Sequence, residues 1–137
     1  MKFVLAILFS VVIWQTGSSQ VRCDSIPEKF FSVFGEKSSD AAIDWVYSTN
    51  KYIRNNIQGN LKVKTELKKI ISLIGAYKGY ELMEKKVISP SYVQLYYLAK
   101  FERQPLKFIF VLYKPADKWQ LQKLRFDDKV AEEFEKK

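Results

Sequence analysis

The fold is decided by residues 77–128, which read YKGYELMEKKVISPSYVQLYYLAKFERQPLKFIFVLYKPADKWQLQKLRFDD. Apolar and polar residues alternate here in short segments, and brief turn signals such as Ser89-Pro90 and Lys114-Pro115 separate them. Such alternation predicts half-buried strands, and short connections join antiparallel neighbours. The stretch therefore predicts an antiparallel meander of about four strands.

Four strands are expected, at Ala76–Ile88, Tyr92–Glu102, Leu106–Tyr113 and Lys118–Phe126. The odd residues of the second strand are the better core candidates, and the third strand is apolar on both faces, as in a central strand covered on each side. Gly79 predicts a bulge or a close backbone approach in the first strand. A second bulge near Gln122-Lys123 would put all apolar residues of the last strand on one face.

The preceding residues, about 25–75, have helical periodicity. One helix is expected from the capping box at Ser25 to a stop at Gly35, and another from Ser39 to about Ser48. A long helix is expected over Tyr52–Ile74, weakened or kinked around Gly59-Asn60. Asp128 can cap a short final helix over 129–137. The chain therefore predicts one α+β domain over residues 20–137, with N-terminal helices packed on a curved antiparallel meander.

The first nineteen residues have the order of a secretory signal peptide, with Lys2 before an apolar run and small residues up to Ser19. The apolar run is too short for a stable membrane span, so we expect cleavage near Ser19 and a secreted or periplasmic domain. Cys23 is the single cysteine, which excludes an internal disulfide. It either forms an intermolecular disulfide or is an idle thiol on a mobile tail.

The chain of 137 residues has a formal net charge of +8. This charge either keeps the domain dispersed or serves an anionic partner. One expected basic helix face carries Lys62, Lys64, Lys68 and Lys69. Nucleic acid is not favoured as a partner, because no aromatic residue interleaves with these lysines.

Three segments carry a resemblance to a known family: Gly79-Tyr80-Glu81, residues 97–108 (YLAKFERQPLKF) and residues 113–119 (YKPADKW). Over about residues 29–128 the chain resembles small secreted bacterial NTF2-like proteins of unassigned function, within the cystatin-like α+β folds. The resemblance implies a fold that hosts isomerases, dehydratases and binding modules, and that often forms homodimers through the sheet. It names no activity, since fold does not imply function.

The sequence contains no histidine, which removes histidine triads and most zinc sites, and we expect no metal or cofactor. A carboxylate with a tyrosine remains, as in ketosteroid isomerase. Glu81 is the candidate base, and its alternative role is a surface ion pair. The candidate pocket consists of Tyr80, Glu81, Tyr96, Tyr97, Tyr113 and Trp119.

Glu102 and Arg103 form a candidate polar pair, which either binds a carboxylate or partner, or fixes the hairpin. We expect a non-enzymatic binding or interaction module with a concave aromatic-lined sheet face. The partners considered are a second copy through the sheet and a small apolar or glycan ligand. The alternatives are an isomerase-like enzyme and a basic module for anionic polymers.

Overall fold

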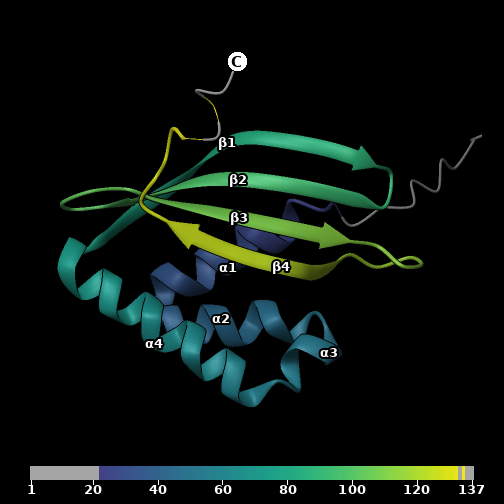
Figure 1. The fold of residues 1–137 in the computed structure, drawn as a ribbon, viewed down its shortest axis with the longest axis horizontal. Helices are drawn as coiled ribbons and strands as arrows, with labels where there is room; N and C mark the ends of the chain where they lie inside the picture. The colour runs from purple at the N-terminus through teal and green to yellow at the C-terminus, as the bar shows by residue number, and fades with distance from the viewer. Residues whose placement is uncertain (1–21, 133, 135–137) are drawn as a thin grey trace, which may run out of the picture.

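The computed structural model describes residues 22–132 and 134 of the chain. Four helices gather on one side of a four-stranded sheet, so the chain is an α+β protein as expected (Figure 1). The expected leader lies outside the described residues. The elements are α1 (Ser25–Glu36), α2 (Ser39–Ser48), α3 (Lys51–Arg54), α4 (Ile57–Ile74), β1 (Tyr77–Ser89), β2 (Tyr92–Phe101), β3 (Leu106–Tyr113) and β4 (Gln120–Asp127).

The sheet is an antiparallel meander in the order β1-β2-β3-β4, which confirms the expected topology. The odd residues of β2, from Val93 to Phe101, all belong to the main core. In β3 every residue except Tyr113 is buried, so the strand has buried residues on both faces as its sequence predicts. The sheet therefore has a helix-covered face and a second face, here called the open face, which carries Tyr96, Ile109 and Val111.

Both expected bulges are present. Gly79 has φ of 133° at a register shift between β1 and β2, in a region of backbone space that favours glycine. In β4, Leu121 pairs with Leu112 and Lys123 with Val111, which leaves Gln122 as the extra residue. The bulge brings Leu121 and Phe126 to the same face, where both contact the main core.

The helix boundaries differ from the expected ones at three places. The long helix breaks at Asn55-Asn56 instead of Gly59-Asn60, because the Asn56 side chain accepts a hydrogen bond from the Gly59 amide and caps α4. The first helix continues through Gly35 to Glu36. Val130 to Glu132 form a turn, not the start of a helix, and 133 and 135–137 lie outside the described residues.

Aromatic rings join α1 to the sheet. The Phe30 ring contacts the rings of Phe108 and Phe110 at centroid distances of 5.7 and 5.2 Å. Phe31 contacts Tyr97 at 5.5 Å, and both side chains are buried. Such pairs add about 0.5–1.5 kcal/mol each beyond the burial of their area. The aromatic rings on the helix-covered face of the sheet are thus packed against α1.

The outer edge of β4 is tied to the corner between α2 and α3. The buried Asn50 donates from Nδ2 to the Leu121 carbonyl at 2.8 Å, and its Oδ1 accepts from the Tyr52 amide and caps α3. Thr49 Oγ1 accepts from the Leu121 amide at 3.0 Å. The main chain of β4 at Leu121 therefore has its hydrogen-bond partners on the side away from β3.

Candidate functional site

The aromatic residues of the candidate pocket lie on opposite faces of the sheet. Tyr97 belongs to the main core, and Tyr80 stacks on Phe31 at 4.5 Å on the helix side. Tyr96 packs on the open face, where Tyr113 pairs with Tyr92. The six residues therefore do not form one pocket, because neighbouring strand residues such as Tyr96 and Tyr97 point to opposite faces.

Glu81 lies on the surface. Its side chain is 60% exposed, and its Oε1 is 3.3 Å from Lys100 Nζ. The isomerase alternative requires this carboxylate to be enclosed beside a tyrosine hydroxyl, and the geometry does not meet that requirement. Its role is the surface ion pair, which contributes little to stability.

Trp119 precedes β4 and packs against the edge of the main core, with Lys114 Nζ at 5.2 Å from its ring. It lines a small cavity of about 210 Å³ with Ile26, Asp117 and Lys118. Cys23 lies two residues before α1, and its side chain is buried in the main core, not on a mobile tail.

The candidate pair Glu102 and Arg103 lies where the β2–β3 connection meets the end of α4. Arg103 donates from Nη1 to the Leu73 carbonyl at 3.1 Å, and from its backbone amide to the Ile74 carbonyl at 2.9 Å. Arginine thus satisfies carbonyls that a helix end leaves without partners. The connection is fixed to α4 by these bonds.

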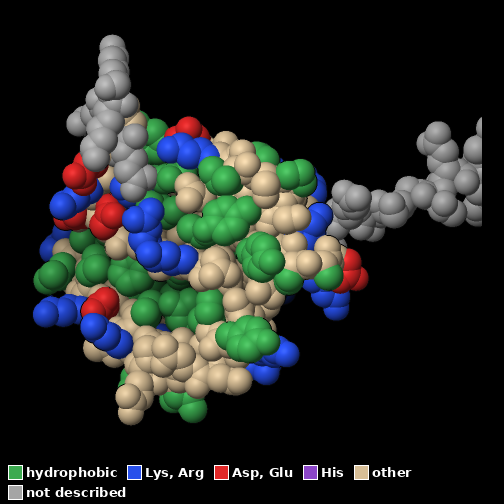
Figure 2. Space-filling model, turned by 45° about the vertical axis from the view of Figure 1, so that its right-hand side comes forward, with side chains coloured by type: hydrophobic (Ala, Val, Ile, Leu, Met, Phe, Trp, Pro, Cys, Tyr) green, Lys and Arg blue, Asp and Glu red, His purple; other side chains and the backbone are tan. Residues whose placement is uncertain are grey.

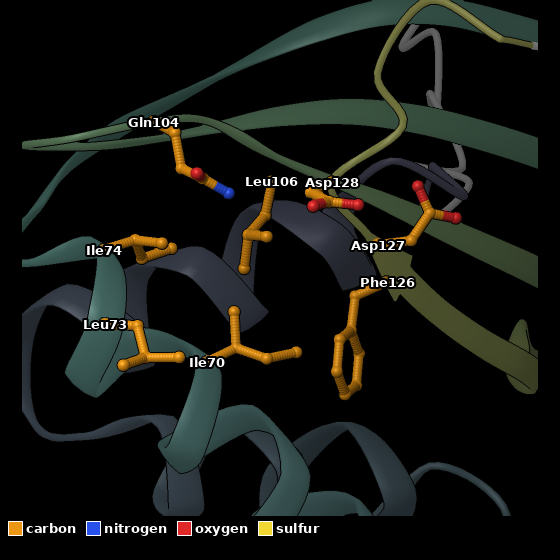
Figure 3. Close-up of a pocket in the computed structure, with 8 residues that line it drawn as sticks. All are labelled: Ile70, Leu73, Ile74, Gln104, Leu106, Phe126, Asp127 and Asp128. Atoms are coloured by element: carbon orange, nitrogen blue, oxygen red, sulfur yellow. The ribbon is translucent and has the colours of Figure 1, made fainter.

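A cleft opens between α4, the start of β3 and the end of β4, and we call it the α4 cleft. Its volume is about 460 Å³, within the range of about 300–1,000 Å³ of small-molecule sites. Figure 3 shows side chains from both walls directed into the space. The lining residues are Ile70, Leu73, Ile74, Gln104, Leu106, Phe126, Asp127 and Asp128.

The α4 cleft exists because α4 packs chiefly against α2. Lys64 pairs with Asp44 and Lys68 with Asp40, so two lysines of the basic helix face hold α4 to α2. The bonds of Arg103 join the two walls at one end. Between the walls, apolar side chains remain accessible.

The charged groups that line the α4 cleft lie at one end of it. Asp127 Oδ1 is 3.5 Å from Lys107 Nζ and accepts a hydrogen bond from the Lys129 amide. Asp128 is exposed and forms no ion pair within residues 22–132 and 134. The charged lining residues are thus both acidic, in a chain whose net charge is +8.

Sequence patterns did not identify this site. The sequence contains one clue to the cleft: Leu73 is an apolar residue next to the buried stripe of α4. In the structure this side chain is 64% exposed. Large exposed apolar residues of this kind carry information when they line a cavity.

The pKa shifts in the fold are caused by burial and by a side-chain hydrogen bond, at residues outside the α4 cleft. Burial raises the pKa of Tyr97, and it raises the pKa of Tyr77 to about 12. A hydrogen bond from Arg22 lowers the pKa of the Asp24 carboxyl. None of these groups lines the α4 cleft. Within residues 22–132 and 134, no group of three or more acidic, histidine or cysteine side chains is placed to hold a metal ion.

No helix in the described part of the chain is long and apolar enough to cross a membrane. Comparison of the chain with protein-family models, with curated proteins and with solved structures found no match.

Proposed function

We propose that this protein is a secreted or periplasmic, non-enzymatic binding module whose ligand occupies the α4 cleft. The observation that carries the proposal is an accessible, mainly apolar space of about 460 Å³ with charged groups at one end only. The leader-like residues 1–19 support export, and the NTF2-like resemblance is compatible with a binding module.

The lining defines the class of ligand. Leu73, Leu106 and Phe126 offer apolar contact, which stabilises a ligand by about 25 cal/mol for each Å² removed from water. Asp127 and Asp128 favour a cation or a hydrogen-bond donor beside that apolar surface. The ligand is therefore a small amphipathic molecule with an apolar body and a cationic end.

The test compares three simple probes: dodecylamine, dodecanol and dodecanoate. Titration calorimetry, at probe concentrations below those at which the probes aggregate, should show the highest affinity for the amine, a lower one for the alcohol and the lowest for the carboxylate. Asp128→Asn should reduce the preference for the amine, because one acidic group is removed without loss of volume. Equal affinities for the three probes, or no binding of any, would contradict the proposed ligand class.

A matched pair of variants tests the location. Leu73 lines the cleft and is 64% exposed, whereas Leu61 is 62% exposed on the same helix and does not line it. Leu73→Gln should weaken binding of the amine about tenfold, and Leu61→Gln should leave it unchanged, with similar stability for both. Native mass spectrometry of protein purified from the cell-envelope fraction then measures three things together: whether the leader is cleaved, whether a ligand is retained and whether the expected homodimer forms.

Binding of an anionic polymer has weaker support. Figure 2 shows Lys and Arg side chains spread around the viewed face, without a single large basic patch. A basic module would bind heparin with an affinity that falls steeply as salt rises. The amphipathic ligand class predicts a smaller salt dependence, because apolar contact is not screened.

A further inference from the structure

We propose that the open face of the sheet is a peptide-binding surface, and that its occupant is the C-terminal segment of the same chain that contains Lys129 and Phe134. Tyr96, Ile109 and Val111 are buried on this face in a cluster separate from the main core. All helices of the described part lie on the other side (Figure 1), so burial here requires another cover. The proposal does not depend on the α4 cleft.

The path of the segment is defined by hydrogen bonds. Asp127 Oδ1 accepts from the Lys129 amide at 2.9 Å, an Asx turn that redirects the chain as it leaves β4. Lys107 Nζ then donates to the Lys129 carbonyl at 2.9 Å. Figure 1 shows the chain running from the end of β4 toward β1. The segment therefore crosses the strands of the sheet.

An aromatic contact lies farther along the segment. The Phe134 ring meets the Tyr96 ring edge-on, at a centroid distance of 5.8 Å and an interplanar angle of 73°. Tyr96 lies on β2, two strands away from β4. Edge-to-face geometry at this distance is the favourable arrangement for aromatic pairs. Phe134, which stays 41% exposed, thus gives the segment an aromatic contact with the open face.

Lys107 gives the surface a means of recognising backbone. Lys107 is the second residue of β3, and it is almost completely buried, with 1% of the residue exposed. Burying an ammonium group is costly unless polar partners surround it. Its partners include the Lys129 carbonyl and the Asp127 carboxylate, so the docked segment supplies one of them.

The charges of the face and the segment are complementary. Residues 132–135 read Glu-Glu-Phe-Glu. Lys123 and Arg125 lie in the open-face rows of Val111 and Ile109, and Lys86 Nζ lies 4.9 Å from the Tyr96 ring. The recognised chemistry is therefore an aromatic side chain flanked by carboxylates.

The test uses the full chain and a synthetic peptide with the sequence of residues 128–137, DKVAEEFEKK. In the wild-type chain the tethered segment competes with the peptide at a high effective concentration. Phe134→Ala weakens this competitor, so the variant should bind the peptide at least about tenfold more tightly than the wild type. Tyr52→Ala, which removes an exposed aromatic side chain from α3, should behave as the wild type. A peptide with alanine in place of phenylalanine should bind weakly to all three proteins.

Equal affinity of the peptide for the wild type and Phe134→Ala, or binding to neither, would overturn the proposal. The Tyr96 ring-proton NMR shifts provide an independent measurement, since loss of the Phe134 ring should change them and leave those of Tyr113 unchanged. Unchanged Tyr96 shifts would also overturn it. A dimer that is lost in Phe134→Ala would assign the segment to a second copy and refute the intramolecular occupant.

Discussion

Asn50 offers the sharpest test of how the helices are fixed to the sheet. The side chain is 5% exposed and makes two hydrogen bonds, one to the Leu121 carbonyl and one from the Tyr52 amide. Asn50→Ala removes a helix cap worth about 1 kcal/mol. It also leaves a buried carbonyl without its partner, at about 1–3 kcal/mol. The expected loss in the free energy of unfolding is therefore about 2–4 kcal/mol.

The matched control is Asn56→Ala. Asn56 is exposed and caps α4 through a single local bond to the Gly59 amide, so its loss should cost about 1 kcal/mol. Urea denaturation of both variants measures the difference, with an unchanged slope if the native state stays compact. Thr49→Ser keeps the hydroxyl that accepts from Leu121 and should retain most of the stability. If Asn50→Ala costs no more than Asn56→Ala, the tertiary bond to β4 does not stabilise the fold and the reasoning fails.

Three further predictions concern the core and the turns. Phe30→Ala should lower the free energy of unfolding by about 3–5 kcal/mol in urea denaturation, because the ring is fully buried among aromatic neighbours. A loss no larger than that of a substitution at an exposed aromatic residue such as Tyr52 would contradict this. Gly75→Ala should cost about 1–3 kcal/mol by the same assay, since φ is +91° and a Cβ would lie 3.0 Å from Glu102 Cβ. Burial raises the pKa of Tyr97 above its unfolded value near 10, so the neutral ring contributes stability fully below pH 10. That contribution is lost as pH rises through the folded pKa, at up to about 1.4 kcal/mol per pH unit, and Tyr97→Phe should flatten the decline of the urea midpoint above pH 10.

The strands were predictable because their signal is local. Each apolar residue of β2 that was assigned to the core lies there, and β3 is apolar on both faces because both faces are covered. The bulge at Gln122 followed from a change of parity between Leu121 and Phe126. Period-two patterns of this kind report on burial directly.

The candidate site was less predictable because it depends on how distant elements meet. Tyr96 and Tyr97 are adjacent in the sequence but belong to different faces, so a tyrosine-rich sequence did not produce a tyrosine-lined pocket. The α4 cleft depends on the distance between α4 and β4, which no local pattern encodes. The break before α4 was also missed, because an asparagine cap at Asn56 outweighed the helix-weakening effect of Gly59.

The two edges of the sheet differ in a way that limits how copies of the chain associate. At Leu121 the outer side of β4 already bonds Asn50 and Thr49, whereas no strand in the described part pairs with the outer side of β1. Exposed main-chain groups at a sheet edge are the usual route by which strands add to one another. Strand addition is therefore blocked at Leu121 of β4, and two copies joined along β1 through a twofold axis would use up both β1 edges. Such a pair, if it forms, would leave no free β1 edge for a third copy.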